Sequence, residues 1–144
     1  MLVSKILEAK PDMGVITVSP DSLIGEAVKI LSSKGIGTVV VSSDGTALDG
    51  ILSERDIVRA LGVEGAGCLS GPVSSLMTKK IKTCGPTDQA DDVLTTMTAG
   101  RFRHMPVIAE GKMIGLISIG DVVKARLAEL AMEKDALEGM IMGH

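Results

Sequence analysis

The chain has 144 residues, of which 45% are hydrophobic, and its formal net charge is −3. This length suits one compact domain or two small halves that share a core, and the hydrophobic content is that of a globular protein. The negative charge and the single aromatic residue, Phe102, argue against a nucleic-acid-binding protein, which needs a basic surface and rings on which bases can stack.

Targeting signals, membrane segments and disulfides are not expected either. The apolar runs fall short of the roughly 18 residues of a membrane span, and the first residues do not form a charged leader followed by an apolar stretch. The two cysteines, Cys68 and Cys84, and the two histidines offer neither a disulfide framework nor metal-ligand spacing. We therefore expect a cytoplasmic protein with no metal site and no membrane partner.

The first half of the chain predicts alternating helices and strands. Ile24, Ala27, Val28 and Leu31 follow the i, i+3, i+4, i+7 spacing of a helix with one buried face, and Ser22 is the expected N-cap. The expected elements are a lead helix at 3–7, a strand at 15–18, a helix at 22–34, strands at 36–42 and 49–53, and a helix through 61.

The same order of elements returns after a glycine-rich connector at 62–72. The expected elements are a lead helix at 73–77, a strand at 81–84, a helix capped by Asp88 with apolar positions Ala90, Val93, Leu94 and Met97, strands at 103–108 and 113–118, and a final helix. Thr83 follows Thr17 by 66 residues and Asp121 follows Asp56 by 65, so the copies differ by one residue in the hairpin. This duplication predicts an α+β fold of two tandem β-α-β-β-α repeats related by a pseudo-two-fold axis, with clefts between them.

The expected boundaries place the first repeat at 1–65, a connector and lead-in helix at 66–80, the second repeat at 81–128 and a C-terminal helical extension at 129–144. The extension continues an apolar stripe that Lys134 interrupts. Such an extension either covers the core or contacts a partner subunit, and we favour the partner. The stripe and the apolar strands predict a homodimer, formed mainly through the helices of the repeats. The stripe consists of Val123, Leu127, Leu130, Leu137 and Ile141.

Ser53 and Ser118 each stand three residues before an aspartate, Asp56 and Asp121, at a turn from a strand into a helix. One interpretation is structural, because Ser-x-x-Asp resembles a capping box. The other is functional, because a carboxylate beside free amides at a helix start can accept both hydroxyls of a ribose. The recurrence of the pair at one position of the repeat favours the functional interpretation.

A basic segment precedes the middle strand of the second repeat. Arg101, Arg103 and His104 fall within four residues and are suited to bind an anionic group such as phosphate. The alternative is a solvated turn, and regular strand alternation would send Arg103 and His104 to opposite faces. Residues 35–38, which match this segment in the first repeat, carry no charge, and Arg55 is the only compensating cation.

Motifs of common enzyme classes are missing from the sequence. It contains no Gly-Lys-Ser/Thr P-loop, and the Gly35-Ile36-Gly37 segment lacks the third glycine of a dinucleotide-binding loop. No Ser/His/Asp set stands in a fitting context. We therefore expect a protein that is not an enzyme.

Segments of both repeats resemble the signature regions of cystathionine β-synthase (CBS) domains, and the whole resembles a stand-alone bacterial CBS pair, or Bateman module. The resemblance covers about residues 3–127 and implies a regulatory module. Such modules bind AMP, ADP, ATP, NAD(H) or S-adenosylmethionine and thereby sense energy or redox state for a partner, which is unknown here. The segments are Gly50–Val58, Arg103–Val107 and Gly115–Val123.

The resemblance also implies roles for individual residues. Asp56 and Asp121 would hold ribose, Arg103 and His104 would approach phosphate, and the regions of Thr17 and Thr83 would line the adenine. We further predict that the cleft built on Asp121 binds a monophosphate more tightly. The full set of expected nucleotide-binding residues is Thr17, Gly37, Thr38, Ser53, Arg55, Asp56, Lys82, Thr83, Arg103, His104, Met105, Pro106, Ser118 and Asp121.

One departure from the family pattern, one prediction for the base and one alternative function accompany this interpretation. The first repeat has Val40 where the second has Pro106, which weakens the case for its phosphate end. With Phe102 as the only aromatic residue, the base is expected between aliphatic side chains with its edge read by main-chain groups. The alternative function is a scaffolding module whose clefts are vestigial and whose tail recruits a partner.

Overall fold

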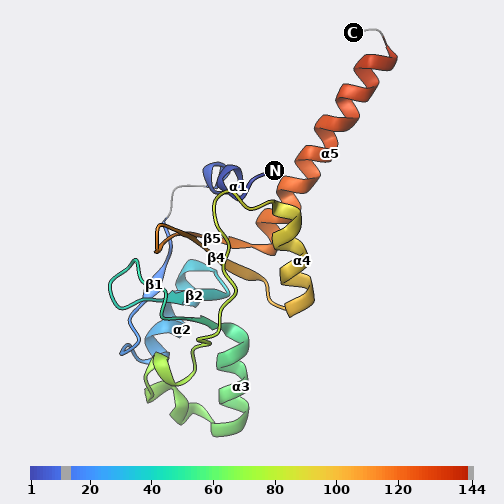
Figure 1. The fold of residues 1–144 in the computed structure, drawn as a ribbon. Coiled ribbons are helices and arrows are strands. Elements are labelled where there is room, and N and C mark those ends of the chain that lie inside the picture. The colour runs from blue at the N-terminus through green and yellow to red at the C-terminus, as the bar shows by residue number, and fades with distance from the viewer. Residues whose placement is uncertain (11–13, 143–144) are drawn as a thin grey trace. The chain divides into compact units, whose positions relative to one another are not determined.

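A computed structural model describes residues 1–10 and 14–142 and has a mixed α+β architecture (Figure 1). The order of elements confirms the predicted repetition. The helices are α1 (Val3–Ala9), α2 (Ile24–Lys34), α3 (Glu54–Glu64), α4 (Ala90–Gly100) and α5 (Ile119–Ile141). The strands are β1 (Thr17–Val18), β2 (Thr38–Val41), β3 (Gly50–Ser53), β4 (His104–Ala109) and β5 (Lys112–Ser118), and two 3₁₀ helices are η1 (Ala66–Ser70) and η2 (Val73–Ser75).

The chain forms two compact units that do not follow the linear order of the repeats. Within the described residues, unit 1 comprises 1–10, 83–109 and 115–142, and unit 2 comprises 14–82 and 110–114. Helix α1 therefore belongs with the strands and helices of the second repeat, and η1 and η2 belong with those of the first. Each repeat is completed by the lead-in segment that precedes the other one.

Unit 2 contains a three-stranded sheet in the order β1-β2-β3. Strand β1 runs parallel to β2 with Thr17 opposite Val40, and β3 runs antiparallel to β2 with Ser53 opposite Thr38. This antiparallel pairing brings the start of β2 and the end of β3 to the same end of the sheet. The core beneath it consists of Val18, Ile24, Ala27, Leu31, Val39, Val41, Leu52, Ile57 and Val73.

Unit 1 repeats this arrangement with one strand less. Strands β4 and β5 pair, and the predicted strand at 81–84 is reduced to a single parallel bridge from Cys84 to Val107. In unit 2 the Val40 N–H donates to the Ile16 carbonyl at 3.2 Å. The matching residue in unit 1 is Pro106, which has no N–H, so this ladder bond cannot form and the strand is shorter.

The two cores contain the apolar positions that the sequence predicts. Ile24, Ala27 and Leu31 are buried on α2, and Ala90, Val93 and Met97 are buried on α4, while Val28 and Leu94 pack at the edges of the cores. Both cysteines are buried and free. The core of unit 1 consists of Val3, Ile6, Cys84, Ala90, Val93, Met97, Met105, Val107, Ile117 and Val122.

Glycines allow each lead-in segment to approach its sheet closely. A Cβ at Gly115 would lie 2.7 Å from Cδ2 of Leu7 on α1, and a Cβ at Gly50 would lie 2.7 Å from Sδ of Met77. Gly50 and Gly115 hold matching positions, 65 residues apart. The same close contact is therefore built twice, once in each unit.

The predicted side-chain caps at Ser22 and Asp88 are wrong. Helices α2 and α4 begin after the extended residues Leu23 and Gln89, and neither has a side-chain cap. The first helical amides instead donate to lead-in carbonyls, Ile24 N to Gly71 O and Ala90 N to Met1 O, both at 2.9 Å. The capping requirement of these helix starts is met by backbone from a distant part of the chain, so a polar side chain is not needed there.

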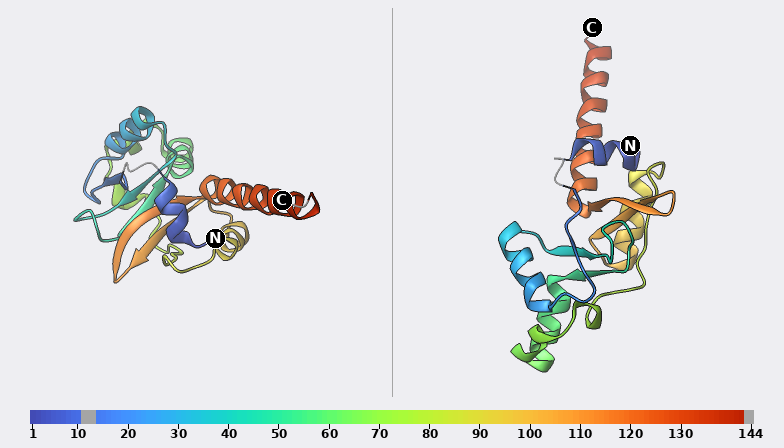
Figure 2. Two further views of the ribbon diagram at one scale, coloured as in Figure 1. Left: turned by 90° about the horizontal axis from the view of Figure 1, so that it is seen from above. Right: turned by 90° about the vertical axis from the view of Figure 1, so that its left-hand side faces the viewer.

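Helix α5 is the longest element. Its first turns pack on α1 and α4 within unit 1, and its C-terminal half extends past them (Figures 1 and 2). Among the described residues, no helix combines the length and apolar character needed to cross a bilayer.

Candidate functional site

Both Ser-x-x-Asp pairs form capping boxes at strand-to-helix turns, as the structural interpretation predicts. In unit 2, the Ser53 N–H donates to Oδ2 of Asp56 at 3.0 Å, and the Asp56 N–H donates to Oγ of Ser53 at 3.3 Å. In unit 1, the Ser118 N–H donates to Oδ2 of Asp121 at 2.9 Å, and the Asp121 N–H donates to Oγ of Ser118 at 3.1 Å. Within residues 1–10 and 14–142, no hydrogen bond reaches Oδ1 of either carboxylate.

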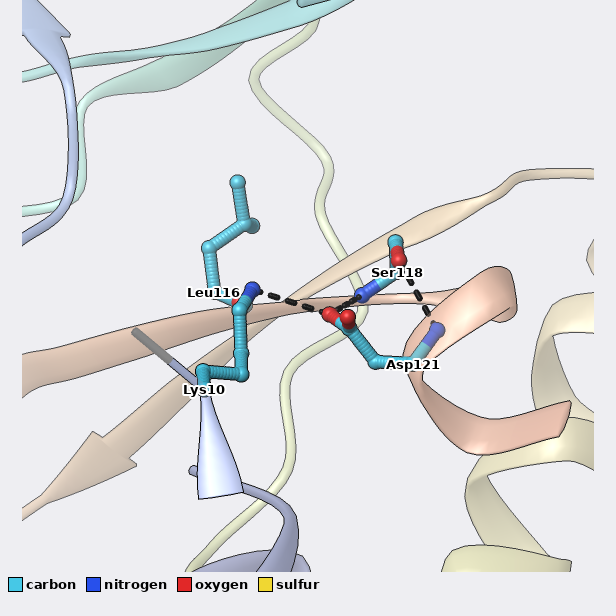
Figure 3. Close-up of polar contacts among 4 residues, drawn as sticks. All are labelled: Lys10, Leu116, Ser118 and Asp121. Atoms are coloured by element: carbon cyan, nitrogen blue, oxygen red, sulfur yellow. Dashed lines mark hydrogen bonds and ion pairs between the residues drawn. The ribbon is translucent and has the colours of Figure 1, made fainter. Parts of the chain in front are cut away.

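The carboxylate of Asp121 has a partner that Asp56 lacks. Nζ of Lys10 donates to Oδ2 of Asp121 at 2.8 Å and to the Leu116 carbonyl at 2.7 Å (Figure 3). Burial raises the pKa of Asp121, but the hydrogen bonds from Lys10 and from Ser118 outweigh it, so the pKa lies below its ordinary value. The carboxylate is therefore ionised at neutral pH and held in one orientation.

The start of each middle strand is tied to the helix that carries the aspartate. The Glu54 N–H donates to the Gly37 carbonyl at 2.9 Å in unit 2, and the Ile119 N–H donates to the Arg103 carbonyl at 2.8 Å in unit 1. This bond occupies the first amide of the helix and brings the strand start beside the capping box. The basic segment and Asp121, which are far apart in the sequence, are thereby neighbours.

The other expected site residues of unit 2 are distributed around the same end of its sheet. Thr17 begins β1, and Thr38 is buried at the start of β2 opposite Ser53. Arg55 is exposed on the first turn of α3, and Lys82 is exposed at the end of the unit. The carboxylate of Asp56 is bonded twice by Ser53, through its N–H and through Oγ at 2.9 Å.

The expected residues of unit 1 divide into exposed and buried positions. Thr83 and Arg103 are exposed, whereas Met105 and Pro106 are buried within β4. His104 is half-buried at the first position of β4. The start of β4 is irregular, as convergence of Arg103 and His104 would require, because a bend at Arg103 precedes the strand.

His104 lies in an environment that favours its neutral form. Burial lowers the pKa of His104 from 6.5, the positive charge of Lys10 lowers it further, Asp121 opposes the shift, and Arg103 adds to it. Lys10, Arg103 and Asp121 are therefore close enough to act on the imidazole. At neutral pH the site combines two cations, a carboxylate and an uncharged imidazole that still has one N–H donor.

Arg101 holds an unusual backbone conformation directly before this segment. It ends α4 in the left-handed region with φ of 58°, where the matching residue of unit 2 is Gly35 with φ of 64°. Glycine adopts this region without strain and arginine does not. A cation therefore stands in unit 1 at a position where backbone geometry favours glycine.

Sequence reasoning missed Lys10. The residue is separated from Asp121 by 111 positions, and nothing in its local sequence marks it as a ligand of a carboxylate. The lead helix is repeated at 73–77, and Lys80 holds the position that corresponds to Lys10, but Lys80 is exposed. A comparison of the two lead-in segments identifies Lys10 only if it is already known that each segment packs in the unit formed by the other repeat.

The protein-family model of the CBS domain matches residues 6–63 and 73–128. The chain belongs to the CBS-domain family. The two matches cover both repeats in tandem, as the resemblance of the signature segments predicts, and they leave α5 outside the family match beyond residue 128.

Solved structures support the same assignment for this CBS pair. The CBS-domain containing protein ATU1752 from Agrobacterium tumefaciens is 44% identical, with a TM-score of 0.83 over 88% of this chain and 99% of that one. CBSX2 in complex with AMP is 25% identical, with a TM-score of 0.74 over 88% and 96% of the two chains. The CBS domain pair of protein MJ0100, in complex with 5-methylthioadenosine and S-adenosyl-L-methionine, is 25% identical, with a TM-score of 0.76 over 90% and 98%.

Proposed function

We propose that this CBS pair is a non-enzymatic regulatory module that binds an adenine nucleotide, with AMP as the preferred ligand at the capping box of Asp121. The observation that carries the proposal is the environment of this carboxylate. It is ionised, held by Lys10 and Ser118 through Oδ2, and adjoins the basic start of β4. Two relatives supply the ligand class, since their structures contain AMP or adenosyl compounds.

The ribose would bind to the carboxylate of Asp121. Its Oδ2 is committed to the capping box and to Lys10, whereas Oδ1 accepts no hydrogen bond from the described residues. An ionised carboxylate with one uncommitted oxygen is suited to accept hydroxyl donors, and charge-assisted bonds of this kind are stronger than neutral ones. The capping box therefore orients the ribose acceptor, and the two interpretations of Ser-x-x-Asp are compatible.

The phosphate would bind to the basic group around the start of β4. Arg103 is exposed, Lys10 lies within hydrogen-bond distance of Asp121, and the half-buried His104 responds to both charges. Bound phosphate would favour protonation of His104 by adding negative charge beside it. This group of cations favours a phosphorylated adenosine over the sulfonium of S-adenosylmethionine, which remains the alternative ligand.

The adenine would lie between aliphatic side chains. The ring of Phe102 packs against the core of unit 1 and covers Gly100, where a Cβ would lie 2.3 Å from Cε1 of the ring, so it is committed to the fold. The edge of the base would be read by main-chain groups near Thr83. A ligand-bound structure with the base stacked on Phe102 would contradict this arrangement.

Unit 2 would bind a monophosphate more weakly. Its carboxylate, Asp56, has no lysine partner among the described residues, and residues 35–38 carry no charge. Arg55, exposed on the first turn of α3, offers a cation next to the capping box. A dinucleotide such as NAD(H) is the ligand for which this unit could use Arg55.

The proposal is tested by thermal unfolding of the full chain with AMP, ATP, NADH and S-adenosylmethionine. A ligand present at 100 times its dissociation constant should add about 2.7 kcal/mol to the free energy of unfolding. We expect the largest shift with AMP and the smallest with S-adenosylmethionine. The absence of a shift with all four at millimolar concentration would favour the second candidate function, a scaffold with vestigial sites whose exposed α5 recruits a partner.

The proposal also includes a homodimer, a cytoplasmic location and a regulated partner protein. A homodimer through the helices of the repeats is supported by exposed apolar side chains on α3, of which Val58 and Val63 are 66% and 81% exposed. We keep the cytoplasm as the predicted location, and the regulated protein as a partner whose identity the site does not indicate.

A further inference from the structure

One face of α5 carries a regular stripe over almost three heptads. Its positions are separated by four, three, four, three and four residues, which is the a/d spacing of a coiled-coil seam. The helix is continuous over the whole stripe. We define the α5 stripe as Val123, Leu127, Leu130, Lys134, Leu137 and Ile141.

The α5 stripe is exposed along its entire length. Lys134, the one polar member, is also exposed and lies 3.8 Å from Glu138 on the same helix. A continuous apolar seam of this length is unusual on the surface of a monomer and is typical of an interaction surface. The exposed fractions are 42% for Val123, 63% for Leu127, 45% for Leu130, 60% for Leu137 and 85% for Ile141.

A different face of the same helix packs on unit 1. Val122 is fully buried, Arg126 lies 3.8 Å from Asp91, and Glu129 lies 3.2 Å from the N-terminal amine. At about 100° per residue, the centre of this packed face lies roughly 90° around the helix from the centre of the α5 stripe. The α5 stripe therefore remains open while the helix is anchored to its own unit, and its C-terminal half projects past α1 and α4 (Figure 2).

We propose that the α5 stripe binds the same stripe of a second copy of the chain as a short antiparallel coiled coil. If the two helices cross at residue 132, Val123 faces Ile141, Leu127 faces Leu137 and Leu130 faces Lys134 of the second copy. In this register all six positions on each helix have a partner. The proposal does not depend on nucleotide binding, and it concerns a contact distinct from one through the helices of the repeats.

Charges beside the α5 stripe select the antiparallel orientation. In a parallel pair, Lys134 would face Lys134 at the seam, and Glu133 would flank Glu138 of the second copy, so like charges would meet at both places. In the antiparallel register, Lys124 flanks Glu138 of the second copy, and this favourable pair forms twice by symmetry, against one like-charge contact between the two Glu133 side chains. The two Lys134 side chains are also offset along the axis and can extend towards solvent at the rim.

The structure lowers the cost of forming so short a coiled coil. An isolated helix of this length is marginal in water because nucleation of the first turn is unfavourable. Here the first turns of α5 are fixed by the capping box of Ser118 and by packing on α1 and α4. Most of the ordering of the helix is therefore complete before a second copy binds. Lys134 limits the affinity of the pair and fixes its register, as a single polar residue at heptad position a does in other coiled coils.

Sedimentation equilibrium of the full chain at micromolar concentrations tests the contact with two variants. Leu137→Glu places two charges in the seam of each dimer and should raise the dissociation constant of the α5 contact by at least about 100-fold. Met132→Glu is the matched control, because Met132 is 70% exposed on the opposite side of the same helix, and it should leave the dissociation constant unchanged. Both residues are exposed, so neither variant should unfold the protein.

Glu138→Lys tests the orientation. In the antiparallel pair it should weaken association, because two lysines then meet, and the added change Lys124→Glu should restore it. In a parallel pair Glu138→Lys would instead strengthen association by meeting Glu133. The proposal is overturned if the wild-type chain is monomeric throughout, if Leu137→Glu acts no differently from Met132→Glu, or if Glu138→Lys tightens the complex.

Discussion

Replacement of Lys10 by methionine tests the ion pair that distinguishes the two capping boxes. The change removes the ammonium and keeps most of the aliphatic stem, so it removes the bonds of 2.8 Å to Asp121 and 2.7 Å to the Leu116 carbonyl. Bonds to charged groups contribute about 1.5–3 kcal/mol when buried, but the Lys10 side chain is 37% exposed and the pair is partly screened. We therefore expect the free energy of unfolding to fall by about 1–2 kcal/mol at pH 7.

The pH dependence of this loss separates the ion pair from simple packing. The pKa of Asp121 is lowered on folding from its ordinary value of 3.8, despite burial, by the bonds from Lys10 and Ser118. Its ionisation therefore stabilises the fold above the unfolded-state pKa, and this contribution disappears as the pH falls through the folded-state pKa. The difference between wild type and Lys10→Met should accordingly shrink in acid.

Urea unfolding at pH 7 and at about pH 2.5 measures both effects. Lys5→Met is the matched control, since Lys5 lies on α1, which Lys10 directly follows, and forms an exposed pair with Glu8, so its loss should cost about 0.3 kcal/mol or less. An equal destabilisation by Lys10→Met at the two pH values would show that the stem, and not the charge, matters. No destabilisation at either pH would refute the ion-pair account.

Two further predictions concern the fold of unit 1. Gly115→Ala should lower the free energy of unfolding by about 1–3 kcal/mol because its Cβ would meet Leu7. In a double-mutant cycle with Leu7→Ala, the loss in the double variant should be smaller than the sum of the two single losses. Strict additivity would contradict the proposed contact. Arg101→Gly should stabilise the protein by about 0.5–1 kcal/mol because residue 101 has φ of 58°, whereas Arg101→Ala should not. Equal free energies of unfolding for the two variants would disprove strain at this position.

The repeated architecture could be predicted because local sequence patterns determine it. The buried positions of α2 and α4 follow helical spacing, and the Ser-x-x-Asp boxes need only residues three apart. The exchange of lead-in segments could not be predicted in this way. An amphipathic helix such as α1 indicates that it must be covered, but its sequence does not state which repeat covers it.

The candidate site was predictable to a similar extent. Asp121 and Arg103 stand in recognisable segments, and the bond from Ile119 N to Arg103 O explains why those segments meet. Lys10 was not predictable, because its role follows from the position of α1 in unit 1. The expected caps at Ser22 and Asp88 failed for a related reason, since backbone from the lead-in segments satisfies the helix starts.

The central claim is that the capping box of Asp121 binds the ribose of an adenine nucleotide, and titration calorimetry with AMP tests it most directly. Asp121→Ala and Asp56→Ala remove the same capping interaction from equivalent helices, so each controls for the structural effect of the other. Loss of one charge-assisted bond costs about 1.5–3 kcal/mol, which is about tenfold or more in affinity. We predict that Asp121→Ala and Arg103→Ala each weaken AMP binding at least tenfold and that Asp56→Ala weakens it less. Abolition of binding by Asp56→Ala, with binding intact in Asp121→Ala, would contradict the account.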